Sequence, residues 1–437
     1  MEKTQYVVAL EIGSSKIVGA IAEKTPTGYV SVNHLEEEPL SNCVRYGCVQ
    51  NVENTKNVIN RILKKLGNSV DGIIKEVYVG INGRSVHSEP SEVARNLDSA
   101  QQITNSMIET IIKSSKQDIV KNYDTIDIVP RTFYVDNDET KSPSGRFGSK
   151  IDIKLNKIVA KPNIKLNLDR VLSSVVKVKD YLVTPLVVGE EILTSEELSL
   201  GCMLVDMGAE TTSVVIYKDS ALVYLVTLPL GGRNITRDLV NGLQIVEEAA
   251  ERVKKNIGTP LDPSAESIVI EGVNSKTASN YISARTGEII ANINKQINYA
   301  NLTNDDIKSI VLIGGGARMQ GIQGKLEEMA KIKVRMGSYP TSLNILNHAI
   351  NKPEYVELFA LLAKAADVIP AGFSCLERRI YDDGPEWVDP TPSPSPGPDA
   401  TGDETPKGGK KKGPSFWDRV MGKASQLLEE NDNEDEK

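Results

Sequence analysis

The sequence predicts an α/β chain built from two similar halves. The first reason is a strand–turn–strand pattern that occurs at residues 6–22 and again at residues 202–217. In both copies an acid stands two residues before a glycine, small hydroxyl residues follow, and a second apolar strand completes the hairpin. The second reason is residues 311–318, where an apolar strand runs into three glycines. Two phosphate-type hairpins and one glycine turn, in this order, predict two halves that close on one nucleotide.

Each hairpin carries the residue types that a phosphate site needs. Gly13 and Gly208 permit positive φ and a close approach of the backbone, and a tight turn presents its N–H groups as an anion-binding nest. Glu11 and Asp206 offer the oxygen ligands that Mg²⁺ prefers, directly or through water. A glycine hairpin is also a common turn without any ligand, in which the acid simply begins the turn. The repetition at matched positions favours nucleotide binding.

Composition is typical of a soluble globular protein with more than one domain. The chain has 437 residues, of which 40% are hydrophobic and 25% charged, and this length exceeds one hydrophobic core. The net charge of −8 argues against nucleic acid as a partner. No apolar run reaches the roughly 18 residues of a membrane span, and the charged N-terminus is unlike a signal peptide. The cysteines match no zinc spacing and are expected to be free thiols in a reducing cytoplasm: Cys43, Cys48, Cys202 and Cys375.

The hydrophobic patterns between these motifs predict further elements in order. Residues 85–165 change in character and predict an inserted α+β unit of subdomain size; the alternative is that they only extend the first domain. The elements expected in the first half are a strand at 29–35, a helix at 55–66, a strand at 76–81, a helix at 103–120, strands at 126–135 and 151–161, a helix at 168–176, a strand at 180–188 and a helix at 189–193. Those expected in the second half are a strand at 221–228, helices at 235–257 and 282–300, a short helix at 319–331 and a helix at 355–366.

The C-terminal residues predict a tether followed by an amphipathic helix. Residues 382–413 are rich in Pro, Gly, Ser, Thr and Asp, a composition that cannot bury a core, so we predict a disordered linker. Residues 414–430 place apolar side chains on one stripe of a helix. The stripe includes Phe416, Trp417, Val420, Met421, Leu427 and Leu428. Such a helix lies in a membrane surface, docks on a partner protein or folds back on the body of the chain. The lysines before it favour lipid, and the acidic end of the chain favours the other two.

Five segments resemble the nucleotide-binding segments of the actin/Hsp70/sugar-kinase superfamily. Residues 10–17 and 204–212 look like its two phosphate segments, and residues 311–322 look like its adenosine segment. Residues 228–238 and 248–254 resemble the stretch after the second hairpin and the helix that touches the adenosine. Within this superfamily the chain is most similar to the FtsA family of actin-like bacterial cell division proteins. The resemblance covers about residues 5–380 and the tail.

The resemblance implies an actin-like (ribonuclease H-like) two-domain ATPase fold with an inserted α+β subdomain. The expected first domain (1A) comprises residues 1–84, 166–200 and 350–381, and its insertion (1C) comprises residues 85–165. The expected second domain (2A) comprises residues 201–233 and 308–349, and its smaller lobe (2B) comprises residues 234–307. The linker at 382–413 and the membrane-targeting helix at 414–430 complete the chain. ATP and Mg²⁺ are the implied cofactors, with Glu11 and Asp206 holding the metal through water. The implied nucleotide-binding residues are Gly13, Ser14, Ser15, Lys16, Gly208, Ala209, Glu210, Thr211, Thr212, Gly231, Gly232, Glu251, Lys254, Gly314, Gly315, Gly316 and Arg318.

The second phosphate segment departs from the family pattern. Ala209, Glu210 and Ser213 stand where the family carries extra glycines and a later Asp. Ala209 restricts the backbone, and Glu210 is expected to bring a negative charge near the γ-phosphate. No His or general base stands out beside the loops, so no catalytic residue is assigned. We therefore expect ATP binding with hydrolysis that is weak or absent.

The family likeness implies a role in cell division at the membrane. The implied protein polymerises into filaments and recruits the tubulin-like FtsZ through the FtsZ C-terminal peptide, at about residues 234–307. The implied location is the cytoplasmic face of the inner membrane at the septum, with other division proteins and membrane lipid as further partners. Two alternatives remain: a pilus-type actin-like scaffold, and a small-molecule kinase or phosphatase on the same fold. Neither alternative explains the amphipathic helix.

Overall fold

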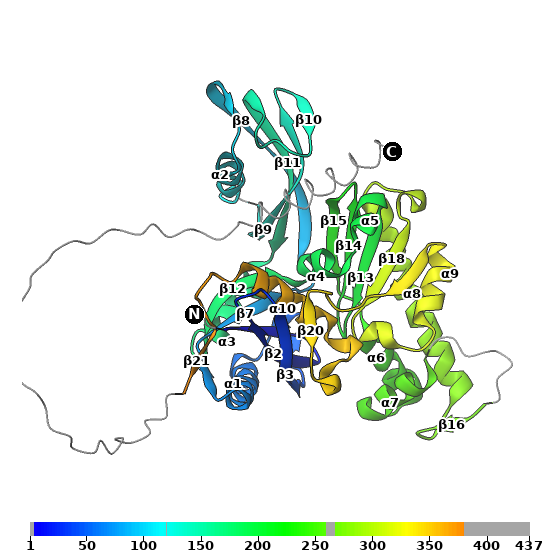
Figure 1. The fold of residues 1–437 in the computed structure, drawn as a ribbon. Coiled ribbons are helices and arrows are strands. Elements are labelled where there is room, and N and C mark those ends of the chain that lie inside the picture. Colours follow the sequence, from blue (N-terminus) through cyan, green and yellow to red (C-terminus); the bar gives the residue numbers. More distant parts are fainter. Residues whose placement is uncertain (1–3, 119, 259–266, 380–437) are drawn as a thin grey trace, which may run out of the picture.

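The computed structural model describes residues 4–118, 120–258 and 267–379. In this part of the chain two large sheets carry the α/β architecture of two halves, and a β-rich module continues the second sheet at one end (Figure 1). The predicted linker at 382–413 and the predicted helix at 414–430 lie outside the described residues. Among the helices that are described, none is both long and apolar enough to cross a bilayer.

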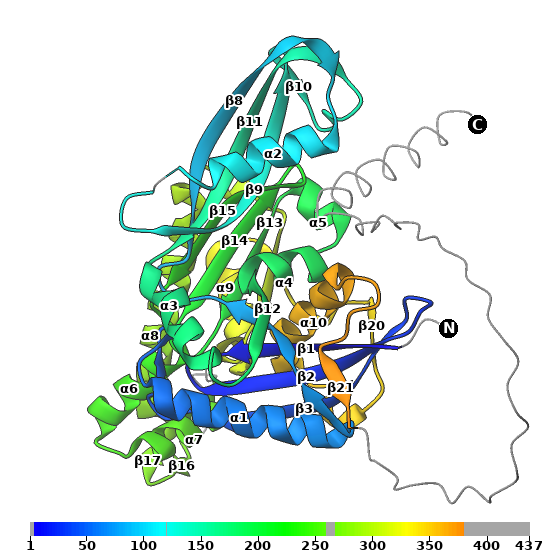
Figure 2. The same ribbon diagram turned by 90° about the vertical axis from the view of Figure 1, so that its left-hand side faces the viewer.

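The first sheet has six strands around the first hairpin. Its order is β12 (Lys177–Val183), β7 (Glu76–Ile81), β1 (Gln5–Ile12), β2 (Lys16–Lys24), β3 (Val30–Pro39) and β20 (Leu343–Ile345). Helices α1 (Val52–Ser69) and α10 (Val356–Val368) pack on its strands and lie on opposite sides of it (Figure 2). Because both faces are covered, residues 6–10 of β1 are all buried and read as a continuous apolar run.

The second sheet has nine strands and joins two parts of the chain. The second half supplies β15 (Ala221–Leu228), β14 (Thr212–Lys218), β13 (Cys202–Met207), β18 (Ser309–Ile313) and β19 (Lys333–Met336). The module supplies β10 (Asp138–Thr140), β9 (Asp124–Val135), β11 (Phe147–Ala160) and β8 (His87–Gln102). The two parts meet where His87 of β8 pairs with Val226 of β15. Two buried hydrogen bonds strengthen this connection: Ser88 Oγ accepts from the N–H of Leu225, and Asn156 Nδ2 donates to Leu222 O.

The module contains a long strand that the sequence did not predict. Strand β8 has 16 residues, most of them polar, and its outer half is mostly exposed. It therefore lacks the apolar alternation by which strands are identified. The predicted helix at 103–120 is the shorter α2 (Asn105–Ser115), which Thr104 caps. Helix α2 and the strands share a small core of their own around Ile103, Ile151 and Ile153.

Several element boundaries differ from the prediction; the helix expected at 168–176 is α3 (Pro162–Leu172), and three other differences have a clear local cause. The single helix expected at 235–257 is two helices, α6 (Gly232–Leu243) and α7 (Glu247–Ile257), because Gln244 takes a left-handed φ of 55° between them. The strand expected at 180–188 ends at Val183, since Pro185 starts α4 (Thr184–Ile192). The helix expected at 282–300 begins earlier, as α8 (Ser275–Tyr299), because Asn274 caps it.

The other described elements are short or complete the layers. The helices are α3 (Pro162–Leu172), α5 (Ser195–Leu200) and α9 (Ile322–Ala330), with 3₁₀ turns η1 (Asn304–Asp306), η2 (Gly316–Arg318), η3 (His348–Ile350) and η4 (Pro353–Tyr355). The strands are β4 (Val44–Arg45), β5 (Cys48–Val49), β6 (Gly72–Ile74), β16 (Val269–Ile270), β17 (Val273–Asn274) and β21 (Leu376–Arg378). Strand β20 differs from the expected domain boundaries: residues 308–349 were assigned to the second domain, yet β20 pairs with β3 of the first sheet. All four cysteines are buried free thiols.

Candidate functional site

Two turns of the same geometry end the repeated hairpins. In each turn the glycine N–H donates to the carbonyl three residues further on, at 3.0 Å from Gly13 and 2.8 Å from Gly208. The strand registers also match, so Glu11 and Asp206 occupy equivalent positions one strand residue before the turn begins. Each first strand has a parallel neighbour on its other side, β7 in the first half and β18 in the second. The two halves therefore repeat the predicted hairpin, and each adds a parallel neighbour whose pairing the sequence did not predict.

The third glycine segment packs directly against the second turn. A Cβ added to Gly316 would lie 2.8 Å from Met207 O and 3.0 Å from Gly208 O. Gly314 has φ +90°, and a Cβ there would meet Met207 O at 2.5 Å. Gly315, between them, faces open space, with no atom within 4 Å of an added Cβ. Glycine is thus required at two of the three positions by a close approach of backbones.

The segment 231–233 closes the same turn from another side. The N–H of Gly232 donates to Gly208 O at 3.0 Å, and the N–H of Arg233 donates to Ala209 O at 2.7 Å. A Cβ on Gly231 would lie 2.7 Å from Ala209 O. Ala209 therefore occupies a turn in which the carbonyls of Gly208 and Ala209 already have partners, and two further backbone segments, 231–233 and 314–316, pack against it.

Three carboxyl groups from separate elements meet between the two turns. Glu11 ends β1, Asp206 ends β13, and Glu357 comes from the first turn of α10; Glu357 shares hydrogen bonds with the other two. Burial and the neighbouring carboxyls raise the pKa of all three groups. Asp206 is 8% exposed, and its Oδ1 has no hydrogen-bond partner among the described residues. A divalent cation would relieve this crowding of buried negative charge, so the donor set fits Mg²⁺.

Several predicted loop side chains contact the protein itself. Ser14 Oγ accepts from the N–H of Gly47 at 3.1 Å, and Thr212 Oγ1 donates to Leu230 O at 2.7 Å. Lys16 pairs with Glu37 at 2.8 Å and lies over the Tyr355 ring. Ser15 is exposed and Thr211 is half-buried. The structure therefore brings the backbones of the two turns to the site, whereas Ser14, Lys16 and Thr212 support the surrounding structure.

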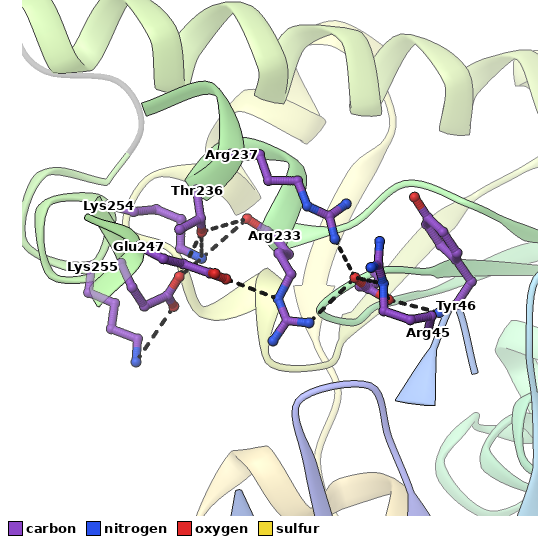
Figure 3. Close-up of polar contacts among 11 residues, drawn as sticks. Arg45, Tyr46, Arg233, Thr236, Arg237, Glu247, Lys254 and Lys255 are labelled. Atoms are coloured by element: carbon purple, nitrogen blue, oxygen red, sulfur yellow. Dashed lines mark hydrogen bonds and ion pairs between the residues drawn. The ribbon is translucent and has the colours of Figure 1, made fainter. Parts of the chain in front are cut away.

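Glu251 and Lys254 form a compact network beside the glycine turn (Figure 3). Lys254 Nζ donates to Glu251 Oε2 at 2.6 Å and to Gly232 O at 3.2 Å. Thr236 Oγ1 donates to the same carboxylate oxygen at 2.7 Å. Burial lowers the pKa of Lys254 although Glu251 opposes the shift. This network holds α7 against α6, and it places a lysine at the edge of the predicted site.

Comparison with known proteins identifies the family. The model of the cell division protein FtsA family matches residues 203–360, and the model of the SHS2 domain inserted in FtsA matches residues 83–159, which include most of the module. The chain is 30% identical over 357 residues to cell division protein FtsA of Porphyromonas gingivalis, with 77% of this chain and 74% of the relative covered. This chain belongs to the FtsA family. It is an actin-like cell division protein, as the sequence predicts.

More distant FtsA proteins match along most of their length. Identity is 26% over 397 residues with FtsA of Bacillus subtilis, covering 87% of this chain and 86% of that protein. It is 23% over 405 residues with FtsA of Escherichia coli K12, covering 88% and 96%. Among solved structures, a PilM–PilN type IV pilus biogenesis complex has a TM-score of 0.61 at 15% identity, covering 82% of this chain and 98% of that chain. That likeness concerns the fold.

The charge that Glu210 adds to the second turn of this FtsA chain is surrounded by cations. Its side chain is 0% exposed, and three arginines surround it: Arg45, Arg233 and Arg237 (Figure 3). Arg237 is the nearest of them, with Nη2 2.6 Å from Glu210 Oε1, and Arg45 comes from a segment that is remote in sequence, so local pattern did not reveal these partners. Glu210 occupies the position that Ser15 holds in the first turn.

Two site residues of this FtsA chain have partners that sequence reasoning missed. Glu357 is a lone acid near the start of the strongly apolar helix α10, and that isolation was the only available signal for it. Arg318, a predicted nucleotide-binding residue, forms an ion pair with Glu354 of η4 in the first half. The predicted nucleotide-binding arginine is therefore engaged in a contact between the halves.

Proposed function

We propose that this FtsA-family chain binds ATP with Mg²⁺ between its two halves, polymerises, and attaches FtsZ filaments to the cytoplasmic face of the inner membrane at the division septum. The observation that carries the nucleotide proposal is the pair of matched glycine turns, one from each half, beside a third glycine segment. Backbone N–H groups in such turns suit phosphate oxygens. Actin-like proteins close around their ligand, and closure biases one conformation of the chain.

The residues around the turns fit both expected cofactors. The turns at 13–16 and 208–211 would cradle the phosphates, while the segment 314–316 and the Glu251–Lys254 network would border the adenosine. Glu11 and Asp206, with Glu357 beside them, would hold Mg²⁺. Among the described residues, no three His, Cys, Asp or Glu side chains are grouped so as to hold a metal ion by themselves. Bound Mg²⁺ would neutralise phosphate charge.

Weak or absent hydrolysis remains our proposal for this site. Ion pairs hold Glu210 in its charged form, but its oxygens are occupied by arginines and an amide and are not free to activate water. Glu357 is buried with two other acids, and its raised pKa favours the protonated form in the absence of a cation. Both carboxyl groups lie at or between the turns, but in this arrangement neither is free to act as a general base.

Membrane attachment is proposed from the tail sequence. Phe416, Trp417 and Leu427 lie on the apolar stripe of the predicted helix, and lysines 410–412 precede it. Each Lys or Arg near an anionic surface contributes about 1 kcal/mol. A single helix of this kind binds weakly, so polymerisation would make attachment multivalent and stable. The FtsZ peptide would bind the lobe at about 234–307, which carries α6, α7 and α8.

Vesicle co-sedimentation tests the proposal as a whole. The full chain and a 1–413 truncation are each mixed with anionic vesicles, with and without ATP. We expect ATP to increase pelleting of the full chain only. Trp417→Asp should act like the truncation, whereas Gln426→Asp, which adds the same charge on the predicted polar face, should lose much less binding. Equal pelleting of the full and truncated chains would refute membrane anchoring through this helix, and direct titration with ATP checks the nucleotide separately.

A further inference from the structure

One hairpin contacts both phosphate-type turns at once. In the turn between β4 and β5, the N–H of Tyr46 donates to Glu210 Oε2 at 2.8 Å, and the N–H of Gly47 donates to Ser14 Oγ at 3.1 Å. Ser14 belongs to the first turn and Glu210 to the second. Gly47 has φ +74°, and a Cβ there would lie 2.6 Å from Gly83 Cα, so the hairpin is fixed closely in place. Adjacent amides of one turn therefore join the two halves.

Glu210 is the centre of this junction. From the first half, Arg45 Nε lies 2.9 Å from Glu210 Oε1. From α6 of the second half, Arg237 Nη2 lies 2.6 Å and Arg233 Nη1 lies 3.4 Å from the same oxygen (Figure 3). A buried carboxylate is stable only when such partners compensate its lost hydration. The junction thus draws cations from both halves onto one buried charge.

The first-half side of the junction is held in position before the halves meet. The guanidinium of Arg45 lies 5.5 Å from the centre of the Tyr46 ring, and that of Arg84 lies 5.4 Å from the same centre. These cation–π contacts restrict the arginine and the aromatic ring. The N–H of Arg84 also donates to Tyr46 O at 3.1 Å. Little ordering is then required when Glu210 enters.

We propose that Glu210 is an interdomain clasp that holds the two halves together when no nucleotide is bound. Its carboxylate lies in the turn that would face the nucleotide phosphates, and it gathers cations from both halves as a phosphate would. The Glu210 carboxylate is therefore an anion, part of the chain itself, that holds the two halves against each other. The clasp does not depend on ATP binding; only its relation to a phosphate rests on the proposed function.

Hydrogen–deuterium exchange of the nucleotide-free full chain tests the clasp. The variants are Glu210→Gln, Arg45→Ala and, as a matched control, Glu247→Gln. Glu247 pairs with the same Arg233 at 3.6 Å, but it is 62% exposed and both residues lie in the second half. We expect amides in 43–50 and 208–211 to exchange roughly 10- to 100-fold faster in the first two variants, because hydrogen bonds to a charged group are lost. The control should exchange like the wild type.

Two results would overturn the clasp: wild-type exchange in the Arg45→Ala protein, or an equal increase in the Glu247→Gln control. Arg45 is partly exposed, so its truncation keeps the test valid even where Glu210→Gln impairs folding. ATP binding is measured on the same proteins by titration. A chain that shows the exchange difference but does not bind ATP would contradict the proposed function and leave the clasp standing.

Discussion

The close approach of the third glycine segment to the second turn can be tested with two neighbouring residues. We predict that Gly316→Ala destabilises the nucleotide-free chain, whereas Gly315→Ala does not. At Gly316 the new Cβ would lie 2.8 Å from Met207 O, a backbone atom that cannot rotate away. At Gly315 it would meet nothing within 4 Å, and the backbone there is already helical with φ −63°. The pair differs by one position and adds the same methyl group.

The expected magnitudes follow from the two environments. Overpacking that forces a backbone shift costs about 1–3 kcal/mol, so Gly316→Ala should lower the free energy of unfolding by that amount in urea titrations followed by circular dichroism. Gly315→Ala should change it by less than about 0.5 kcal/mol, as exposed substitutions do. Equal stability of the two variants would refute the packing that we describe at Gly316.

The same pair of variants separates packing from ligand binding. The open side of Gly315 is the side that we propose to face the adenosine, so Gly315→Ala should weaken ATP binding without loss of stability. Titration of each purified variant with ATP measures this directly. Wild-type affinity in Gly315→Ala would show that the nucleotide does not contact the open side of this segment.

Three further predictions concern the core, the thiols and acid. Phe359 is 0% exposed and packs edge-on against Tyr339 and Tyr355. Phe359→Ala should therefore lower the free energy of unfolding, measured by urea titration, by about 3–5 kcal/mol. A loss below about 1 kcal/mol would contradict that packing. Burial raises the pKa of Cys202 to about 12 and that of Cys375 to about 11. At pH 8 iodoacetamide should therefore label both thiols slowly in the folded chain and quickly in urea. Equal labelling rates in the folded and the unfolded chain would disprove their burial. Although burial opposes it, the Tyr46 amide and the arginines lower the pKa of Glu210 from 4.5. Its stabilisation should therefore be complete above about pH 5 and be lost as pH falls through the lowered value; a stability difference between wild type and Glu210→Gln that stayed constant down to pH 2 would count against it.

The sequence predicted what depends on local pattern. The two hairpins and the glycine turn at 314–316 are short segments whose residue types and spacing carry their own geometry, and strand β15 has the bounds that its apolar run suggests. The break at Gln244 was missed because a left-handed residue other than glycine leaves no clear signal in a helical pattern. Strand β8 was missed because its polar, exposed residues hide the alternation.

The site contacts that were missed are those between remote segments. Glu210 and Arg45 are 165 positions apart, and Glu357 reaches Glu11 only because α10 returns to cover the first sheet. From the sequence alone, the negative charge of Glu210 beside a phosphate loop is expected to repel a phosphate, because its arginine partners cannot be identified there. Local composition identifies the kind of site, whereas ion pairing and proton sharing depend on which elements the fold brings together.

The nine-stranded sheet can convert a small rotation of the second half into a larger movement of the module. Because β8 and β15 belong to one sheet, the module is continuous with the second half although its chain enters and leaves through the first. Sixteen residues of β8 extend roughly 50 Å at about 3.3 Å per residue. A rotation of the second half by about 10° would then carry the outer end, where exposed Phe147 pairs with Gln102, through roughly 9 Å. A small rotation of the second half would thus become a large displacement at the outer end of the module.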